Sequence, residues 1–180
     1  MESRSQVRRR GADTVAAVDD LFAPPGPEWR RISPRLATIR RLVLSAAAVL
    51  TAVVLLILWR MDALSGRSVL LLEVLLLAVF GWAWWLVGRN AAHWGYAEED
   101  DELHITSGAY FRRLVVVPYG RMQYVDVQSG PLDQLYGIAK LQLHTASPGT
   151  SATIPGLPAE EAARLRDRLT ALGETQAAGL

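Results

Sequence analysis

The chain has 180 residues, of which 51% are hydrophobic, and a formal net charge of +1. It contains no cysteine, which excludes disulfide bonds, thiolate metal sites and thiol catalysis. The small net charge hides an asymmetry, because residues 1–41 hold nine arginines against five acidic residues, whereas residues 89–180 hold eight basic against eleven acidic residues.

Residues 1–33 are predicted to form a disordered tail. They combine charged clusters with the breaker sequence Pro24–Pro27 and show little apolar periodicity. The arginines nearest to the apolar segment that follows are candidates for contacts with anionic lipid headgroups, because a basic residue beside an anionic leaflet gains about 1 kcal/mol. These candidates are Arg30, Arg31, Arg35, Arg40 and Arg41.

Residues 34–90 are predicted to form a hairpin of two membrane-crossing helices. Residues 42–59 carry no charge, residues 68–88 carry only Glu73, and a short turn rich in Ser and Gly separates the two runs. Each run has close to the ~20 residues that a helix needs to cross a ~30 Å hydrocarbon layer. A signal peptide and a buried helical hairpin of a soluble protein are the alternatives, and the position and length of the runs disfavour both.

The distribution of arginine predicts the orientation of this hairpin. Arginines are concentrated before the first helix, whereas the turn holds Arg60 and Arg67 beside Asp62. Because Lys and Arg in short flanks are retained in the cytoplasm, both termini of this multi-pass membrane protein are expected there.

Glu73 is the one ionisable residue inside either predicted span. Such residues are functional candidates, and a proton or ion relay is one interpretation. Glu73 lies roughly 9 Å along the helix from its outer end, however, so a contact with headgroups or a pair with Arg60 or Arg67 is the simpler one.

Residues 91–173 are predicted to form a small α+β domain of antiparallel strands closed by one amphipathic helix. The helix opens at Pro158 and ends at Gly173, so that residues 174–180 form a second disordered tail. The expected strands are His93–Ala97, Glu102–Ser107, Tyr110–Pro118, Met122–Ser129, Ile138–Thr145 and Thr150–Ile154, with a turn at Ser147–Gly149 and a helical turn at Gly130–Tyr136.

Several separated motifs occur in a characteristic order along this domain. They are Pro118-Tyr119 with Arg121-Met122-Gln123, then Leu135, Gly137, Ile138 and Leu141, then Thr145-Ala146-Ser147, and finally Ile154-Pro155-Gly156-Leu157. Together with the two apolar helices they resemble the bacterial pleckstrin-homology-like membrane proteins of the YdbS type, over about Pro34 to Leu172. The resemblance implies a bent antiparallel sheet capped by a C-terminal helix, on the cytoplasmic face of the plasma (inner) membrane of a bacterium. It implies no activity.

The sequence contains no recognisable catalytic, metal or cofactor motif, so we predict a protein that is not an enzyme and uses neither a metal nor a cofactor. His93, His104 and His144 lack the spacing of metal ligands. The four acids Glu98–Asp101 lack the alternation of a calcium-binding loop and are more typical of a solvated bend. Phosphate loops and serine-nucleophile motifs are also missing.

A surface for a protein partner or an anion is predicted at Arg112, Arg113 and Arg121. Ordinary surface charge is the alternative interpretation. In eukaryotic pleckstrin-homology domains a basic patch between the first two strands holds phosphoinositides, whereas here the equivalent turn is the acidic Glu98–Asp101. The acidic balance of the domain also argues against nucleic-acid binding.

Two functions are compatible with these features. The first is a non-catalytic interaction or self-assembly module, pinned to the membrane lipid by the hairpin, whose partner is an unknown membrane or cytoplasmic protein or another copy of the chain. The second is a small transport or ion-conducting component that uses Glu73. We favour the first, because neither helix offers a second buried acid, His or Lys to pass a charge onward.

Overall fold

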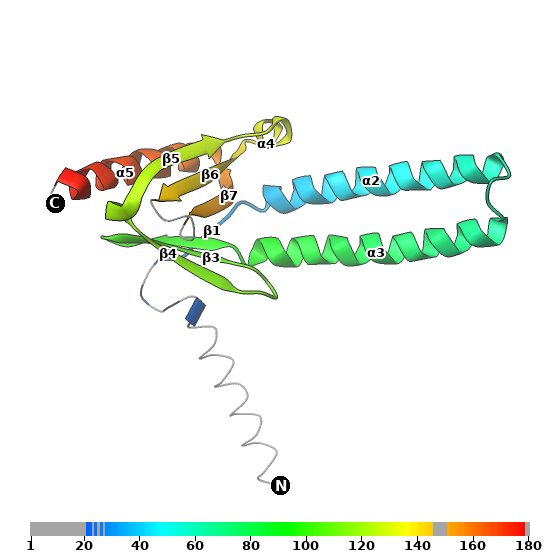
Figure 1. Cartoon of the computed structure of the whole chain (residues 1–180), viewed down its shortest axis with the longest axis horizontal. Coiled ribbons are helices and arrows are strands. Elements are labelled where there is room, and N and C mark those ends of the chain that lie inside the picture. The colour runs from blue at the N-terminus through cyan, green and yellow to red at the C-terminus, as the bar shows by residue number, and fades with distance from the viewer. Residues whose placement is uncertain (1–20, 23, 25, 27, 146–150, 179–180) are drawn as a thin grey trace, which may run out of the picture.

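The computed structural model describes residues 21–22, 24, 26, 28–145 and 151–178 (Figure 1). Two long helices form a hairpin, and the strands and the last helix form a domain at the open end of that hairpin. The predicted tail over residues 1–20 and the predicted turn at Ser147–Gly149 lie outside the described residues.

The hairpin consists of α2 (Arg35–Arg60) and α3 (Gly66–Ala92), which are long and apolar enough to cross a membrane. Ser65 caps α3, since its side-chain oxygen accepts a hydrogen bond from the backbone N–H of Ser68 at 3.2 Å. Large apolar side chains such as Leu50 and Leu71 are about two-thirds exposed. The hairpin therefore matches the sequence prediction and does not have the buried surface of a soluble core.

The domain contains two antiparallel sheets. The first has the order β1-β2-β3-β4 and the second the order β5-β6-β7. The first sheet comprises β1 (Arg30–Arg31), β2 (Gly95–Glu98), β3 (Glu102–Ser107) and β4 (Arg113–Pro118). The second comprises β5 (Met122–Gln128), β6 (Ile138–Thr145) and β7 (Ala152–Pro158), with η1 (Tyr119–Arg121) leading into it and α4 (Pro131–Leu135) between β5 and β6.

Helix α5 (Ala159–Ala178) closes the domain with an apolar stripe. Ala162, Leu165 and Leu169 on this stripe are at most 1% exposed and belong to one core with both sheets. Apolar residues that are spaced three or four positions apart lie on one face of a helix, which can then pack against such a core. The predicted arrangement of antiparallel strands capped by a C-terminal helix is confirmed.

The prediction of a disordered tail is wrong at residues 30–33. Arg30 and Arg31 pair with Tyr96 and Gly95 at the edge of the first sheet, and Ile32 lies in the core with 7% of its surface exposed. A strand of two residues carries no alternating pattern of its own. It forms because β2, far along the chain, offers an open edge after α3 returns to the domain.

The predicted division into a hairpin over residues 34–90 and a domain over residues 91–173 is also too sharp, because the first turns of α2 belong to the domain core. Leu36 and Ile39 are each 7% exposed and pack in the same cluster as the sheets. The N–H of Ser33 donates to the carbonyl of Gly156 at 2.9 Å. Gly156 has a φ of +70°, and a Cβ there would lie 2.8 Å from Leu36 Cβ. We call this contact of Ser33 and Leu36 with Gly156 the joint.

The C-terminal tail is shorter than predicted, because α5 continues through Gly173 to Ala178. A glycine inside a helix costs about 1 kcal/mol relative to alanine, which is too little to end a helix that is held by packing. At Gly173 a Cβ would lie 3.7 Å from the Tyr119 carbonyl oxygen, so the helix passes close to η1 there.

Substituting Gly156 with valine is expected to destabilise the joint. Valine would need a left-handed backbone, which costs of the order of 1–3 kcal/mol, and its side chain would collide with Leu36. We expect the midpoint of thermal unfolding in detergent micelles to fall by several degrees. Gly81→Val is the control, since nothing lies within 4 Å of a Cβ at that position. Equal midpoints of thermal unfolding for the two variants would show that the joint does not stabilise the protein.

Candidate functional site

Among the described residues, Glu99, Glu102 and His104 form the one group of side chains that could hold a metal ion, with ligand atoms within 4.8 Å of one another. The His104 ring instead bonds Glu102 through Nε2 at 2.7 Å, while its buried Nδ1 has no hydrogen-bond partner. A metal on Nε2 would move the ring proton to Nδ1, and metal-bound histidines normally donate that proton to an acceptor. The arrangement fits a hydrogen bond from His104 to a carboxylate better than a metal site.

The other two histidines are also occupied by local contacts. His93 Nδ1 lies 2.7 Å from the carbonyl oxygen of Arg89 at the end of α3. His144 stacks on Tyr124 with ring centroids 4.2 Å apart. No described histidine therefore stands beside a nucleophile in an arrangement that could activate it.

A network of charges around Glu161 ties α5 to the first sheet. The Glu161 carboxylate accepts hydrogen bonds from Arg164 at 2.7 and 2.8 Å, from the Tyr96 hydroxyl at 2.6 Å and from Arg30 at 2.9 Å. Arg164 and Arg168 also bind Glu98 at the end of β2. The hydrogen bonds from Arg164, followed by those from Tyr96 and Arg30, lower the pKa of Glu161 to about 2. Burial, reinforced by Glu161, raises the pKa of Tyr96 to about 12.

The arginines predicted to contact lipid also make contacts within the protein. Arg30 pairs with Glu161, Arg31 donates to the carbonyl of Ala92 at the end of α3, and Arg35 donates to the carbonyl of Tyr136 at 3.1 Å. Arg41 lies over the ring of Trp84 at 5.4 Å and packs against Gly88 of the other helix. Arg31 and Arg35 join the hairpin to the domain, whereas Arg30 acts within the domain and Arg41 acts between the two helices. Contact of these arginines and of Arg40 with lipid remains a prediction.

The three arginines of the predicted partner or anion surface do not form one patch. Arg112 and Arg113 stand where β4 begins, whereas Arg121 is the last residue of η1, beyond the other end of β4. A strand of this length separates them by roughly 20 Å. Arg121 therefore belongs to a different part of the surface.

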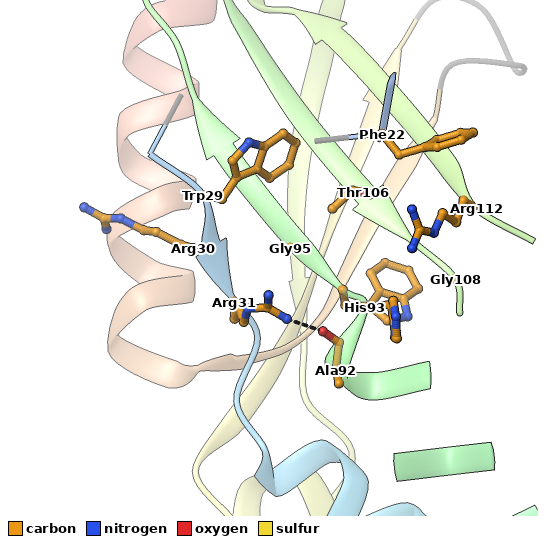
Figure 2. Close-up of a pocket in the computed structure, with 11 residues that line it drawn as sticks. Phe22, Trp29, Arg30, Arg31, Ala92, His93, Gly95, Thr106, Gly108 and Arg112 are labelled. Atoms are coloured by element: carbon orange, nitrogen blue, oxygen red, sulfur yellow. Dashed lines mark hydrogen bonds between the residues drawn. The ribbon is translucent and has the colours of Figure 1, made fainter. Parts of the chain in front are cut away.

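A pocket of about 350 Å³ lies where α3 ends and the chain continues into the first sheet. Figure 2 shows Arg31 and Arg112 reaching toward it from opposite sides, with Trp29 above and His93 below, while Arg30 points away. Within the described part of the chain, the residues that line it include no acid. We call it the junction pocket.

A second hollow of about 350 Å³ runs between β5 and α5. Met122, Gln123, Tyr124 and Val125 form one wall, and the other consists of Leu169, Thr170, Gly173 and Glu174. In the described sheets β5 is an edge strand that pairs with β6 alone. We call this hollow the β5–α5 groove.

The comparisons with known proteins agree with this architecture. Residues 35–172 match the family described as Bacterial PH domain. The chain belongs to this bacterial PH-domain family. It is 33% identical over 137 residues to the UPF0699 transmembrane protein YdbS of Bacillus subtilis (strain 168), covering 63% of this chain and 85% of that protein. It is 30% identical over 88 residues to YdbT of the same organism, covering 46% of this chain and 18% of that protein. No solved structure matches.

The family places the apolar hairpin of this bacterial PH-domain protein in a membrane, since its relatives are named transmembrane proteins. The resemblance inferred from the sequence is confirmed over nearly the same residues. Sequence reasoning missed the Glu161 network and both hollows. From the sequence, Glu161 is recognisable only as an acid in the first turn of a helix. The network could not be predicted because its other members come from β1, β2 and α5.

The bacterial PH domain is expected to lose stability in acid through Glu161. Because its pKa is lowered from 4.5 to about 2 in the folded protein, its stabilising contribution is complete above its unfolded pKa and disappears as the pH falls through this window. At pH 7 the Glu161→Gln variant should have a lower midpoint of thermal unfolding than the wild type. Between pH 4.5 and 2 that midpoint should fall less in the variant than in the wild type. Glu160→Gln, on an exposed neighbour, is the control. Parallel declines for wild type and Glu161→Gln would refute the assignment.

Proposed function

We propose that this protein is a non-catalytic interaction module whose PH-like domain is anchored by the hairpin at the cytoplasmic face of the bacterial inner membrane. The domain binds a protein partner, or another copy of the chain, through the open edge of β5. The cytoplasmic orientation of both termini is supported by the concentration of arginine before α2. The described residues also lack a grouping of nucleophile, base and oxyanion donors.

The single observation that carries this proposal is the edge of β5 beside the β5–α5 groove. An edge strand presents a row of backbone N–H and C=O groups that can pair with an added strand. Tyr124 on this strand is 57% exposed, and Gln123 beside it is exposed as well. An extended segment can therefore obtain backbone hydrogen bonds from β5 and place alternate side chains in the groove, which is how strand addition gives both affinity and specificity.

A photo-crosslinking amino acid at Gln123 tests the edge directly in native membranes. We expect it to capture a specific protein, identified by mass spectrometry, because an added strand would lie against this side chain. The same probe at Asp167, on the outer face of α5 with 69% of its side chain exposed, is the matched control.

Tyr124→Lys should reduce capture at position 123 several-fold, since a charge on an edge strand disfavours strand addition. Loss of the stacking on His144 should lower the stability of the domain by only about 1 kcal/mol, so that the domain stays folded. Capture at position 167 that equals or exceeds capture at position 123 would contradict the proposed edge.

Transport through Glu73 has no structural observation in its favour. Among the described residues, no ion pair joins Glu73 to Arg60 or Arg67, and no second ionisable side chain lies within the spans to continue a relay. We expect Glu73→Gln to retain normal assembly and the crosslink at position 123. Loss of partner capture with normal insertion of the hairpin would instead give the Glu73 carboxylate a functional role.

A further inference from the structure

We propose that the tip of the β3–β4 hairpin, residues 108–112, is a second membrane-binding element, which enters the headgroup layer of the leaflet beside the end of α3. The binding partner is a leaflet that contains anionic lipid. The tip thus adds a direct lipid contact to the two helices and holds one end of the domain against the bilayer.

The direction of the strands brings this tip to the membrane. Strand β2 begins at Gly95, just after α3 ends at Ala92, and runs away from the hairpin. Gly95 pairs with Thr106 and Glu98 pairs with Leu103, so β3 runs back toward the helices. The β3–β4 turn therefore lies beside the end of α3, as Figure 1 shows, and the acidic turn after Glu98 lies at the opposite end of the sheet.

The tip is in direct contact with the membrane helix. The guanidinium of Arg89 lies 5.2 Å from the ring centroid of Trp85 and 5.4 Å from that of Tyr110. Trp85 lies with Trp82 and Trp84 in the part of α3 that is nearest to the domain, and tryptophans gather at the membrane–water interface. Because Arg89 bridges the two rings by cation–π contacts, Tyr110 is held near the depth of that interface.

The residues of the tip suit an interface between lipid and water. Phe111 is 93% exposed and Tyr110 is 58% exposed, and both are followed by arginines at 112 and 113. Gly108 makes this turn, with a φ of +93° and a Cβ position only 2.0 Å from the Phe111 carbonyl oxygen. No described residue covers Phe111, whereas acyl chains next to α3 would do so.

The junction pocket supplies the matching charge. It shares Gly108 and Arg112 with the tip and adds Arg31 and His93, and the described residues that line it include no acid. The indole N–H of Trp94, which also lines the pocket, is buried without a hydrogen-bond partner in the described structure. A lipid phosphate at the mouth of this pocket would meet cationic side chains on two sides, whereas the acidic turn is kept away from the leaflet.

The absence of cysteine from the chain allows the tip to be labelled at a single site. We place an environment-sensitive fluorophore on Ala109→Cys in the full chain, reconstituted in vesicles of phosphatidylcholine with phosphatidylglycerol. The label should be quenched by lipids that carry a nitroxide near the headgroup and protected from aqueous iodide. The control is the same label on Asp100→Cys in the acidic turn, which should respond to iodide alone.

Two further measurements separate the aromatic and the charged contributions. Adding Tyr110→Ser and Phe111→Ser to the labelled chain should lower lipid quenching at least two-fold, and vesicles of phosphatidylcholine alone should lower it by a smaller factor. The proposal is overturned if positions 109 and 100 respond equally to iodide, or if the double serine variant leaves lipid quenching unchanged. Protection from both quenchers would mean that protein covers the tip, which also overturns it.

Discussion

The close packing of α2 against Gly156 is the contact on which the rest of the structure depends. The chain enters the first helix through Ile32, Leu36 and Ile39, which lie in the same core as the two sheets. A backbone at φ +70° leaves room for Leu36 only because position 156 has no side chain. The membrane hairpin is therefore continuous with the domain, instead of being connected to it by a flexible linker.

This continuity determines what the domain can present to its surroundings. The end of the first sheet near the helices carries exposed aromatic and basic residues, and the opposite end carries the acidic turn after Glu98. Edge strand β5 with its groove belongs to the second sheet and leaves a surface for a protein. With one end of the domain at the membrane, this open edge supports the interaction module that we propose.

The sequence predicted the elements whose residues carry a local signal. The uncharged residues 42–59, the alternation in β6 and the apolar stripe of α5 each identify one element by its own period. Ordered motifs from Pro118 to Leu157 were sufficient to indicate the family. These features need no knowledge of what each element packs against.

Features that depend on distant residues could not be predicted in this way. Strand β1 exists because β2 has an open edge, and the Glu161 network combines three elements that are far apart in the chain. Arg112 lines the junction pocket and Arg121 lies far from it, because the extended strand β4 separates these two residues by about 20 Å. Gly173 was a misleading signal, since packing against η1 outweighs its low helix propensity.

The most direct test of this account is the distance between the hairpin and the domain, measured by pulsed electron spin resonance. Spin labels would be attached at Val49→Cys in α2 and Glu160→Cys at the start of α5, which are both exposed positions in a chain without other cysteines. The account predicts one narrow distance distribution in lipid nanodiscs, because the joint makes helix and domain a single body. A broad or multiple distribution would show that the domain moves independently of its membrane helices and would contradict the account.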